Sequence, residues 1–492
     1  MEPVSARHEG DLGGRLNPLG SNPQRVHIIV DEGEAGSLAT QHAAWMTANL
    51  LARMAEDVVS LTITAPEGIP LHERVIPWGT AATLADALVQ GAQAIGITPV
   101  AGEPSGAETL TLVIGANSSA AGDLFVSGYG WTGSVSTDPI RTAVGAMSLP
   151  IGPYIAACLA ARVVFARART TWDDFNHSYS AWSHSSNPEG FTDGPCDADI
   201  VLGEVLLAGV GAVGTALMHT LWAARGVSGS VTVADGDEKG IEASNLNRCM
   251  LFRSDMIGLP KASAAAGLVN GESPVKWDPQ DGRATDIVKF PALVVSAVDS
   301  NTSRAEIQSR YPSVLLSGST RDLRSEILRC GPPGVGACLS CFNRPEQQPS
   351  DEQLKDHIRD NADMEAVALD VGATAADLRS WVETGRCGHL SQESLSRLRG
   401  LVVEGADSDW AVGFVSVFTG TILAAEVLKE ALAAAEPLNS ITQRSTFQFA
   451  SLSTRPELHV RRYLRQQDCP RCSPGVALDK WRGRYIHRGP TG

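Results

Sequence analysis

The chain has 492 residues, of which 43% are hydrophobic and 19% charged, enough for about two to four ordinary globular domains. Its 40 basic and 55 acidic residues give a net charge of −15, which argues against nucleic acid as the main partner. Residues 1–24 contain no apolar core of the signal-peptide type, and the membrane-like stretch 411–428 contains Glu426 and is expected to be a buried core helix. We therefore expect a cytoplasmic protein without a membrane partner.

The chain contains nine cysteines, an odd number, and four of them form two CxxC pairs. This favours metal binding in a reducing compartment over a framework of disulfides.

The first part of the chain alternates strand and helix patterns. Residues 1–24 are rich in Gly, Pro, Asn and Arg and are expected to form a disordered arm. Between residues 25 and 170 we expect strands at 26–30, 58–64 and 110–115 and helices at 40–54, 84–95 and 153–166. This spacing predicts βαβ units and a parallel sheet.

The second part, residues 201–492, repeats the pattern of the first after a polar stretch, 171–200, that is expected to be a linker. The repeated segments pair 58–64 with 229–234, 112–117 with 294–299, and 149–153 with 410–414. Two copies of one unit predict a pseudo-symmetric dimer within one chain, with helices on both faces of parallel or mixed sheets. The first copy lacks the glycine turn described next and is expected to be inactive, whereas residues 345–410 interrupt the second copy as an insertion.

A GxGxxG turn, Gly209, Gly211 and Gly214, follows the first strand of the second copy. Its backbone can approach phosphates at the N-terminus of the next helix. Asp235 ends the following strand, about where a dinucleotide site places a carboxylate for the ribose. Alone, these residues would also fit a dehydrogenase.

Charged residues beyond the glycine turn favour a nucleoside triphosphate instead. Arg248 and Lys261 can neutralise the β- and γ-phosphates, and a carboxylate can hold Mg²⁺. Asp299 follows the apolar run that begins at Leu293, which places it at the carboxyl end of a strand, where ligands bind in open α/β sheets.

Together these motifs resemble the ThiF/MoeB superfamily and, within it, the ubiquitin-activating enzymes. The resemblance extends from residue 201 to 472 and includes 244–248 (SNLNR), 251–253 (LFR) and 299–304 (DSNTSR). An inactive copy followed by an active one is also similar to that branch, in which two halves form one ATP site. The chain is short for a eukaryotic member, so a compact bacterial ubiquitin-like conjugation system fits better.

The resemblance implies that ATP and Mg²⁺ are bound by Gly209, Gly211, Gly214, Asp235, Asp237, Asn245, Arg248, Lys261 and Asp299. Asp235 would hold the ribose, or Asp237 would, because the segment before Ser244 is longer than usual. Asp299 would position Mg²⁺ and the α-phosphate, and Arg304 would anchor the strand end. Cys249 and Ser300 depart from the usual residues, and the first half shows no clear arginine motif that would complete the site.

Two CxxC pairs, Cys338 with Cys341 and Cys469 with Cys472, have the spacing of a four-cysteine zinc site. The family places such pairs in these stretches, which implies a structural Zn²⁺ that ties the C-terminal strand to the core. The rival interpretation is a redox-active CxxC.

Ubiquitin-activating enzymes also need a thiol nucleophile. Cys387 lies between glycines in the insertion, where Arg386 and His389 could lower its pKa. Its alternative role is that of an ordinary loop cysteine, and the remaining candidates are Cys158, Cys196, Cys249 and Cys330.

The sequence thus predicts adenylation of the C-terminal carboxylate of a ubiquitin-like, β-grasp protein, with catalytic roles for Arg248, Lys261 and Asp299. A thioester on Cys387 would then pass to a conjugating enzyme, and the pseudo-dimer could act as a monomer. The alternatives are adenylation without a thioester, as in sulfur-carrier or peptide activation, or a non-catalytic scaffold. An NAD-linked oxidoreductase fits least, because nothing suggests a hydride-transfer site.

Overall fold

The computed structural model describes residues 22–116, 118–140, 149–169, 175–192, 194–197, 199–271, 273–321, 323–331, 337–342, 351–360, 364–384, 390–391, 394–395, 397–398, 412–432, 444–448, 459–461, 466, 469, 471–472 and 479–480.

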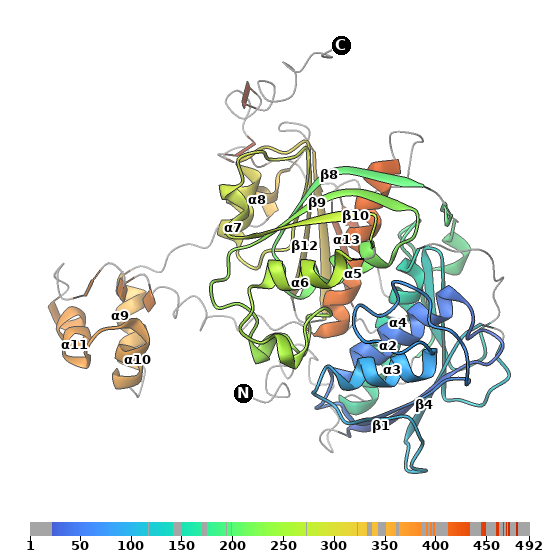
Figure 1. The fold of residues 1–492 in the computed structure, drawn as a ribbon. Coiled ribbons are helices and arrows are strands. Elements are labelled where there is room, and N and C mark those ends of the chain that lie inside the picture. Colours follow the sequence, from blue (N-terminus) through green and yellow to red (C-terminus); the bar gives the residue numbers. More distant parts are fainter. Residues whose placement is uncertain are drawn as a thin grey trace. The chain divides into compact units, whose positions relative to one another are not determined.

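The first half forms a seven-stranded sheet in the order β3-β2-β1-β4-β5-β6-β7 (Figure 1). β3, β2, β1, β4 and β5 run parallel to one another, whereas β6 is antiparallel to β5 and β7 is antiparallel to β6. Its strands are β1 (Gln24–Val30), β2 (Val58–Thr64), β3 (Val100–Ala101), β4 (Leu110–Ile114), β5 (Leu124–Tyr129), β6 (Thr132–Ser136) and β7 (His177–Ser180). Its helices are α2 (Leu38–Ala52), α3 (Leu84–Gln93) and α4 (Ile151–Arg169).

The second half forms an eight-stranded sheet in the order β10-β9-β8-β11-β12-β13-β14-β15. Its strands are β8 (Ile200–Ala208), β9 (Val227–Asp235), β10 (Val275–Asp281), β11 (Leu293–Ser296), β12 (Val314–Arg321), β13 (Arg324–Cys330), β14 (Arg444–Gln448) and β15 (His459–Arg461). Its helices are α5 (Ala212–Ala223), α6 (Lys261–Val269), α7 (Asn301–Gln308), α8 (Leu339–Phe342) and α13 (Gly413–Leu432).

The two sheets share one topology, because β1 to β7 occupy the same places in the first sheet as β8 to β14 do in the second. β2 corresponds to β9, β4 to β11 and α4 to α13, which are the three pairs that the sequence predicts. Two tandem α/β units of the same type are therefore confirmed.

Two glycines allow α4 to pack closely on β5 and β6, a contact that the hydrophobic periodicity of the sequence does not predict. A Cβ on Gly128 would lie 2.4 Å from the backbone of Gly152, and one on Gly133 would lie 2.3 Å from that of Ala156. Backbone therefore packs on backbone where α4 crosses β5 and β6. The range 171–200, expected as a linker, contributes β7 to the same sheet.

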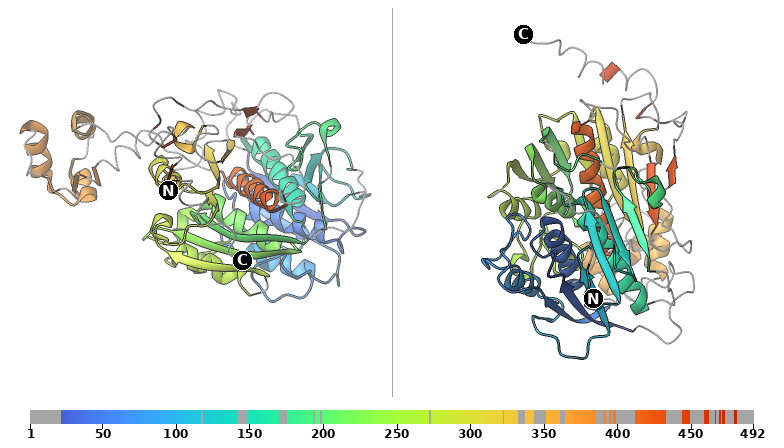
Figure 2. Two further views of the ribbon diagram at one scale, coloured as in Figure 1. Left: turned by 90° about the horizontal axis from the view of Figure 1, so that it is seen from above. Right: turned by 90° about the vertical axis from the view of Figure 1, so that its right-hand side faces the viewer.

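Helices α4 and α13 join the two halves and lie side by side (Figures 1 and 2). Phe165 of α4 meets Phe414 of α13 with ring centroids 5.6 Å apart, and one continuous apolar core includes residues of both halves. Among the described helices, α4 alone is long and apolar enough to cross a membrane, but 94% of that window is buried, as in a core helix. α13 is buried along most of its length, as its sequence predicts.

Residues Pro345–Trp410 form a separate compact unit, in the range expected for the insertion. It contains α9 (Asp351–Asp360), α10 (Met364–Val371) and α11 (Ala375–Thr384) around its own apolar core, which includes Leu354, Leu378 and Trp381.

Candidate nucleotide site and cysteine cluster

Three neighbouring parallel strands bring the predicted nucleotide residues to one edge of the second sheet. Ala208, the last residue of β8, pairs with Ala234 of β9 on one side and with Ser296 of β11 on the other. Gly209 follows Ala208 directly, Asp235 follows Ala234 directly, and Asp299 lies three residues after Ser296. Because the strands are parallel, all three groups lie at the carboxyl edge, where α/β sheets bind ligands.

The three glycines of the turn have different structural reasons for lacking a side chain. Gly209 has a φ of +94° and lies where a Cβ would be 2.7 Å from the carbonyl oxygen of Ala297. A Cβ on Gly214 would lie 2.0 Å from the carbonyl oxygen of Gly209, so α5 can approach the strand only without a side chain there. Beside Gly211, the residue before α5, there is open space. A phosphate can therefore approach the backbone at Gly211.

Two carboxylates, one at the last residue of β9 and one two residues later, have different partners. Asp235 accepts hydrogen bonds from the backbone N–H groups of Val210 (2.6 Å) and Asp237 (3.0 Å), which fixes it against the glycine turn. Asp237 accepts one from the Lys261 ammonium at 2.5 Å. Burial raises the pKa of Asp237, but the hydrogen bonds from Lys261 and from the Lys239 backbone outweigh burial and lower it. Asp235 is therefore fixed by backbone hydrogen bonds, whereas Asp237 pairs with Lys261.

Arg248 and Asp299 are two charged residues of the predicted nucleotide site without a partner in the described part of the chain. Arg248 is half-buried and Asp299 exposed, and neither side chain has a hydrogen bond or ion pair within the described residues. Asn245 is buried, and its side-chain oxygen accepts from the backbone N–H of Glu242 at 2.9 Å. Among the described residues, Arg248 and Asp299 are therefore available to a ligand.

The position of Asp299 is set by the residues that follow it. The Ser300 hydroxyl accepts from the backbone N–H of Ser303 at 3.1 Å and caps the start of α7. Arg304 donates to the carbonyl of Val298 and to the side chain of Asn301, both at 2.7 Å. Arg304 therefore anchors the strand end, as the sequence predicts, and Asp299 is exposed in the turn between β11 and α7.

The matching edge of the first half is filled by acids. Asp31 follows β1 where Gly209 follows β8, and it accepts hydrogen bonds from the Ser118 hydroxyl and the Gly33 backbone. Glu34 lies beside it, and burial together with the Asp31 charge raises the pKa of Glu34. A Cβ on Gly115 would lie 3.0 Å from Asp31 and 3.2 Å from Glu34. Both the negative charge and the occupied space disfavour a phosphate here.

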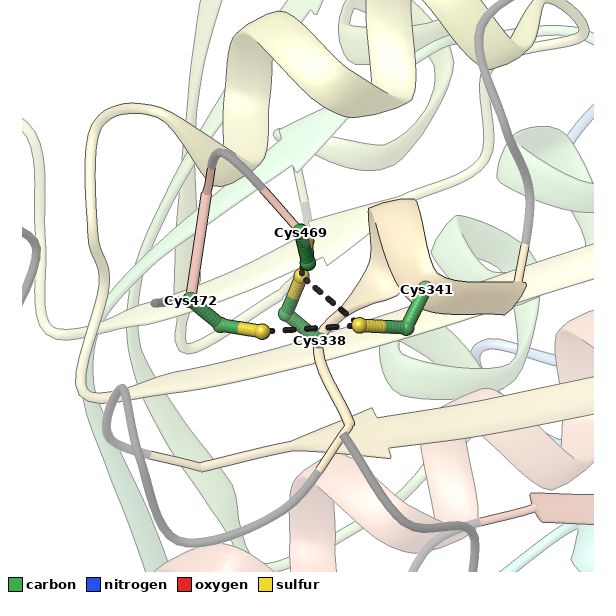
Figure 3. Close-up of side chains that lie close together, drawn as sticks. All are labelled: Cys338, Cys341, Cys469 and Cys472. Carbon is green, nitrogen blue, oxygen red and sulfur yellow. Dashed lines mark hydrogen bonds between the residues drawn. The ribbon is translucent and has the colours of Figure 1, made fainter. Parts of the chain in front are cut away.

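The four cysteines of the two CxxC pairs converge, and all four sulfur atoms lie within 4.8 Å of one another (Figure 3). Three of the Sγ–Sγ distances are 3.4, 3.6 and 3.8 Å. Zinc with four thiolates at about 2.3 Å in a tetrahedron requires sulfur atoms about 3.8 Å apart. The residues therefore fit a tetrahedral zinc ion. Gln466 supports the cluster, because its Nε2 donates to the Cys341 carbonyl at 2.9 Å.

Three candidate nucleophiles are too deeply buried to serve. Burial raises the pKa of Cys158 well above its usual value, that of Cys249 to about 11 and that of Cys330 to about 12. Cys196 is half-buried and its thiol donates to the Gly194 carbonyl at 3.3 Å. Cys387, with Arg386 and His389, lies outside the described residues.

Sequence reasoning missed Arg53, which follows α2 in the first half and contacts the backbone between Leu246 and Phe252. The available signal was a single arginine at the end of an otherwise apolar helix pattern.

Comparison with known proteins matches the two halves separately. The BilD N-terminal domain matches residues 25–182, and the ThiF family matches residues 197–471. An uncharacterized protein of Sinorhizobium fredii, y4jF, is 28% identical over 347 residues, or 62% of this chain. Human ubiquitin-like modifier-activating enzyme 7 is 44% identical over 72 residues, or 14% of this chain. The matches span 64% and 7% of the lengths of these two relatives.

A crystal structure of Escherichia coli MccB with MccA-N7isoASN superposes with a TM-score of 0.36 and 17% identity, over 55% of this chain and 67% of that one. This likeness is too distant to compare sites. The family match covers more than half of the chain and contains every residue of the carboxyl edge described above. The chain belongs to the ThiF family.

Proposed function

We propose that the chain adenylates the C-terminal carboxylate of a ubiquitin-like protein at the expense of ATP. The observation that carries this proposal is that Arg248 and Asp299 have no partner among the described residues, together with the open space at the Gly211 backbone. A hydride-transfer site needs neither charge, whereas transfer of an AMP group needs both a cation for the phosphates and a carboxylate near the α-phosphate. Membership of the ThiF family supports the same chemistry.

The reaction requires positioning more than covalent participation by the protein. A carboxylate oxygen of the substrate attacks the α-phosphorus, the bond to the bridging oxygen of the β-phosphate breaks, and pyrophosphate leaves. Asp235 binds the ribose, and Arg248 and Lys261 take up the charge of the leaving pyrophosphate. Lys261 exchanges its contact with Asp237 for one with the phosphates. Asp299 would hold Mg²⁺, which would supply neutralisation of the phosphate charge.

A second step forms a thioester on Cys387. The thiolate attacks the acyl carbon of the adenylate, and the carbon–oxygen bond to AMP breaks. The burial of Cys158, Cys249 and Cys330 supports this choice by removing three competitors. A conjugating enzyme then accepts the acyl group. If no thioester forms, adenylation alone remains, as in sulfur-carrier or peptide activation.

The partners follow from the same argument. The substrate is a β-grasp protein with a free C-terminal tail, in a bacterial ubiquitin-like conjugation system, which the BilD N-terminal match supports. The name of the human relative, a ubiquitin-like modifier-activating enzyme, is consistent with this class. We place the reaction in the cytoplasm, with no role for nucleic acid or membranes, and a monomer suffices because both halves lie in one chain.

The two remaining sites have supporting roles. The first half is inactive toward nucleotide, because Asp31 and Glu34 occupy its equivalent edge. The four cysteines hold a structural Zn²⁺ that fastens the C-terminal segment to α8.

The adenylation step is tested by ATP–pyrophosphate exchange in the presence of the β-grasp partner. The wild-type chain should exchange, and Asp299→Ala should lose about 10²–10³-fold in rate, the usual loss for a group that stabilises developing charge. Asp278→Ala, an exposed carboxylate on β10, is the matched control and should leave exchange unchanged. Full exchange in Asp299→Ala would remove the basis of the proposal.

The thioester step is tested separately on a non-reducing gel after incubation with ATP and the partner. We expect a reductant-sensitive adduct that is absent from Cys387→Ala and present in Cys196→Ala. Exchange without any adduct would favour the adenylation-only reaction, and an adduct that persists in Cys387→Ala would transfer the role to another cysteine.

A further inference from the structure

Arg53 belongs to the half of the chain without a glycine turn, yet its side chain reaches the nucleotide loop of the other half, which we define as residues 244–253. Arg53 is 2% exposed. Its Nη1 donates to the carbonyl of Leu246, and its Nη2 donates to the carbonyls of Met250 (3.2 Å) and Phe252 (3.0 Å). One guanidinium therefore binds three carbonyls on both sides of Arg248.

The neighbours of Arg53 hold the nucleotide loop from two sides. The Oδ1 of Asn49, one turn earlier on α2, accepts from the Arg53 Nε at 2.7 Å, and its Nδ2 donates to the Met250 carbonyl at 3.4 Å. Across the loop, a Cβ on Gly413 at the start of α13 would lie 3.1 Å from the Asn247 carbonyl oxygen. The backbone that carries Arg248 is therefore fixed between a helix of the first half and α13.

The charge of Arg53 is not neutralised by the protein. Within the described residues, the guanidinium donates only to uncharged oxygens and pairs with no carboxylate. Burial lowers its pKa to about 9, which leaves it protonated at neutral pH. An unpaired buried charge is costly for folding alone, so its position directly behind a phosphate-binding loop needs another explanation. Under the proposed function, a bound triphosphate would supply negative charge near this loop.

We propose that Arg53 is the positioning residue through which the inactive half sets the geometry of the active nucleotide site. This rests on the proposed function. Arg53 acts through the backbone of the nucleotide loop: it fixes the direction of Arg248 and adds positive potential behind the loop. Lysine is a poor replacement, because it lacks the planar fork whose Nη1 reaches Leu246 while Nη2 reaches Met250 and Phe252.

The test measures kcat and KM for ATP in pyrophosphate exchange, using the full chain and the folded fraction from gel filtration. Arg53→Ala and Arg53→Lys should each lose about 10- to 100-fold in kcat/KM, the scale expected for a misplaced phosphate cation. The matched control is Arg169→Ala. Arg169 is also a buried arginine of the first half, but it pairs with Asp57, which precedes β2 at the opposite edge of the sheet. Its kcat/KM should stay within about threefold of wild type.

Chemical rescue distinguishes positioning from general destabilisation. Added guanidinium or methylguanidinium ion should restore part of the lost exchange in Arg53→Ala, where it can fill the vacated space, and should restore none in Asp299→Ala. Wild-type kcat/KM in Arg53→Lys, an equal loss in Arg169→Ala, or the absence of rescue would each overturn the proposal.

Failure of Arg53→Ala to fold and failure of the proposed function can be distinguished from failure of this inference. If Arg53→Ala does not fold, Arg53→Lys and Asn49→Ala carry the test, and wild-type kinetics in both would overturn it. If the wild-type chain shows no exchange with any partner, the proposed function fails instead. ATP affinity by calorimetry then tests the inference on its own, since Arg53→Lys should weaken binding at least about tenfold.

Discussion

Lys429 provides the sharpest test of how the two halves are held together. It lies in α13 and is 1% exposed. Its ammonium donates to the carbonyls of Ala181 (2.6 Å) and Trp182 (3.1 Å), which follow β7 in the first half, and to Glu426 (2.9 Å). Burial raises the pKa of Glu426, but the charges of Lys429 and His184 outweigh burial and lower it to about 2.

The change Lys429→Met keeps the apolar stem but removes the ammonium partner of the fully buried Glu426, which keeps only its contact with His184 at 2.8 Å. Losing one partner of a buried ion pair costs about 3–5 kcal/mol. At about 2 °C per kcal/mol, the lower end of the range for large domains, Tm should fall by about 6–10 °C. The double change Lys429→Met with Glu426→Gln removes the uncompensated charge as well, so it should recover part of this loss.

The assay is thermal unfolding followed by circular dichroism at pH 7. The control is Lys289→Met, since Lys289 is 72% exposed and its pair with Glu204 should contribute little. A fall of less than about 2 °C in Lys429→Met would refute the reasoning, given that the same conversion predicts several degrees. A double variant that loses the sum of the two single losses would show that the charges do not interact.

Three further predictions concern other buried groups. Elemental analysis should find about one zinc per chain, and Cys472→Ser should lose both the metal and several degrees of Tm; a metal-free wild type with the same Tm would contradict this. Burial lowers the pKa of His219 from 6.5 to about 3, so the unfolded chain binds a proton that the folded chain does not. Stability should therefore be complete above pH 6.5 and decrease as the pH falls toward 3, and urea unfolding at pH 7 and 5 should show a smaller difference in His219→Gln than in wild type; equal differences would refute this. Cys249 and Cys158 should resist iodoacetamide in the native chain while half-exposed Cys196 reacts, and mass spectrometry that finds rapid labelling of Cys249 would refute the burial argument.

Local sequence patterns predicted the parts of the fold that depend on local periodicity. The repeated strands β2 and β9 have alternating or continuous apolar runs, and the glycine turn, Asp235 and Asp299 follow strand ends by simple succession along the chain. Parallel strands then bring those ends together without further information.

Features that depend on distant contacts were not predictable. Gly128 in β5 and Gly133 in β6 let the backbone of α4 pack directly on these short strands. Hydrophobic periodicity does not predict such a contact. Arg53 lies 193 residues from Leu246, so only the folded chain shows that it supports the nucleotide loop. The pairing of Lys261 with Asp237 likewise depends on how α6 packs.

The contact between α4 and α13 has a consequence for biosynthesis. Helix α4 leaves the ribosome long before α13 has been made, and its apolar surface has no partner helix from the second half during that interval. Unpaired apolar surface on a nascent chain attracts chaperones and promotes aggregation. Joining two halves in one chain therefore makes their assembly independent of concentration. It also imposes a delay during which the first half must remain soluble without α13 packed against α4.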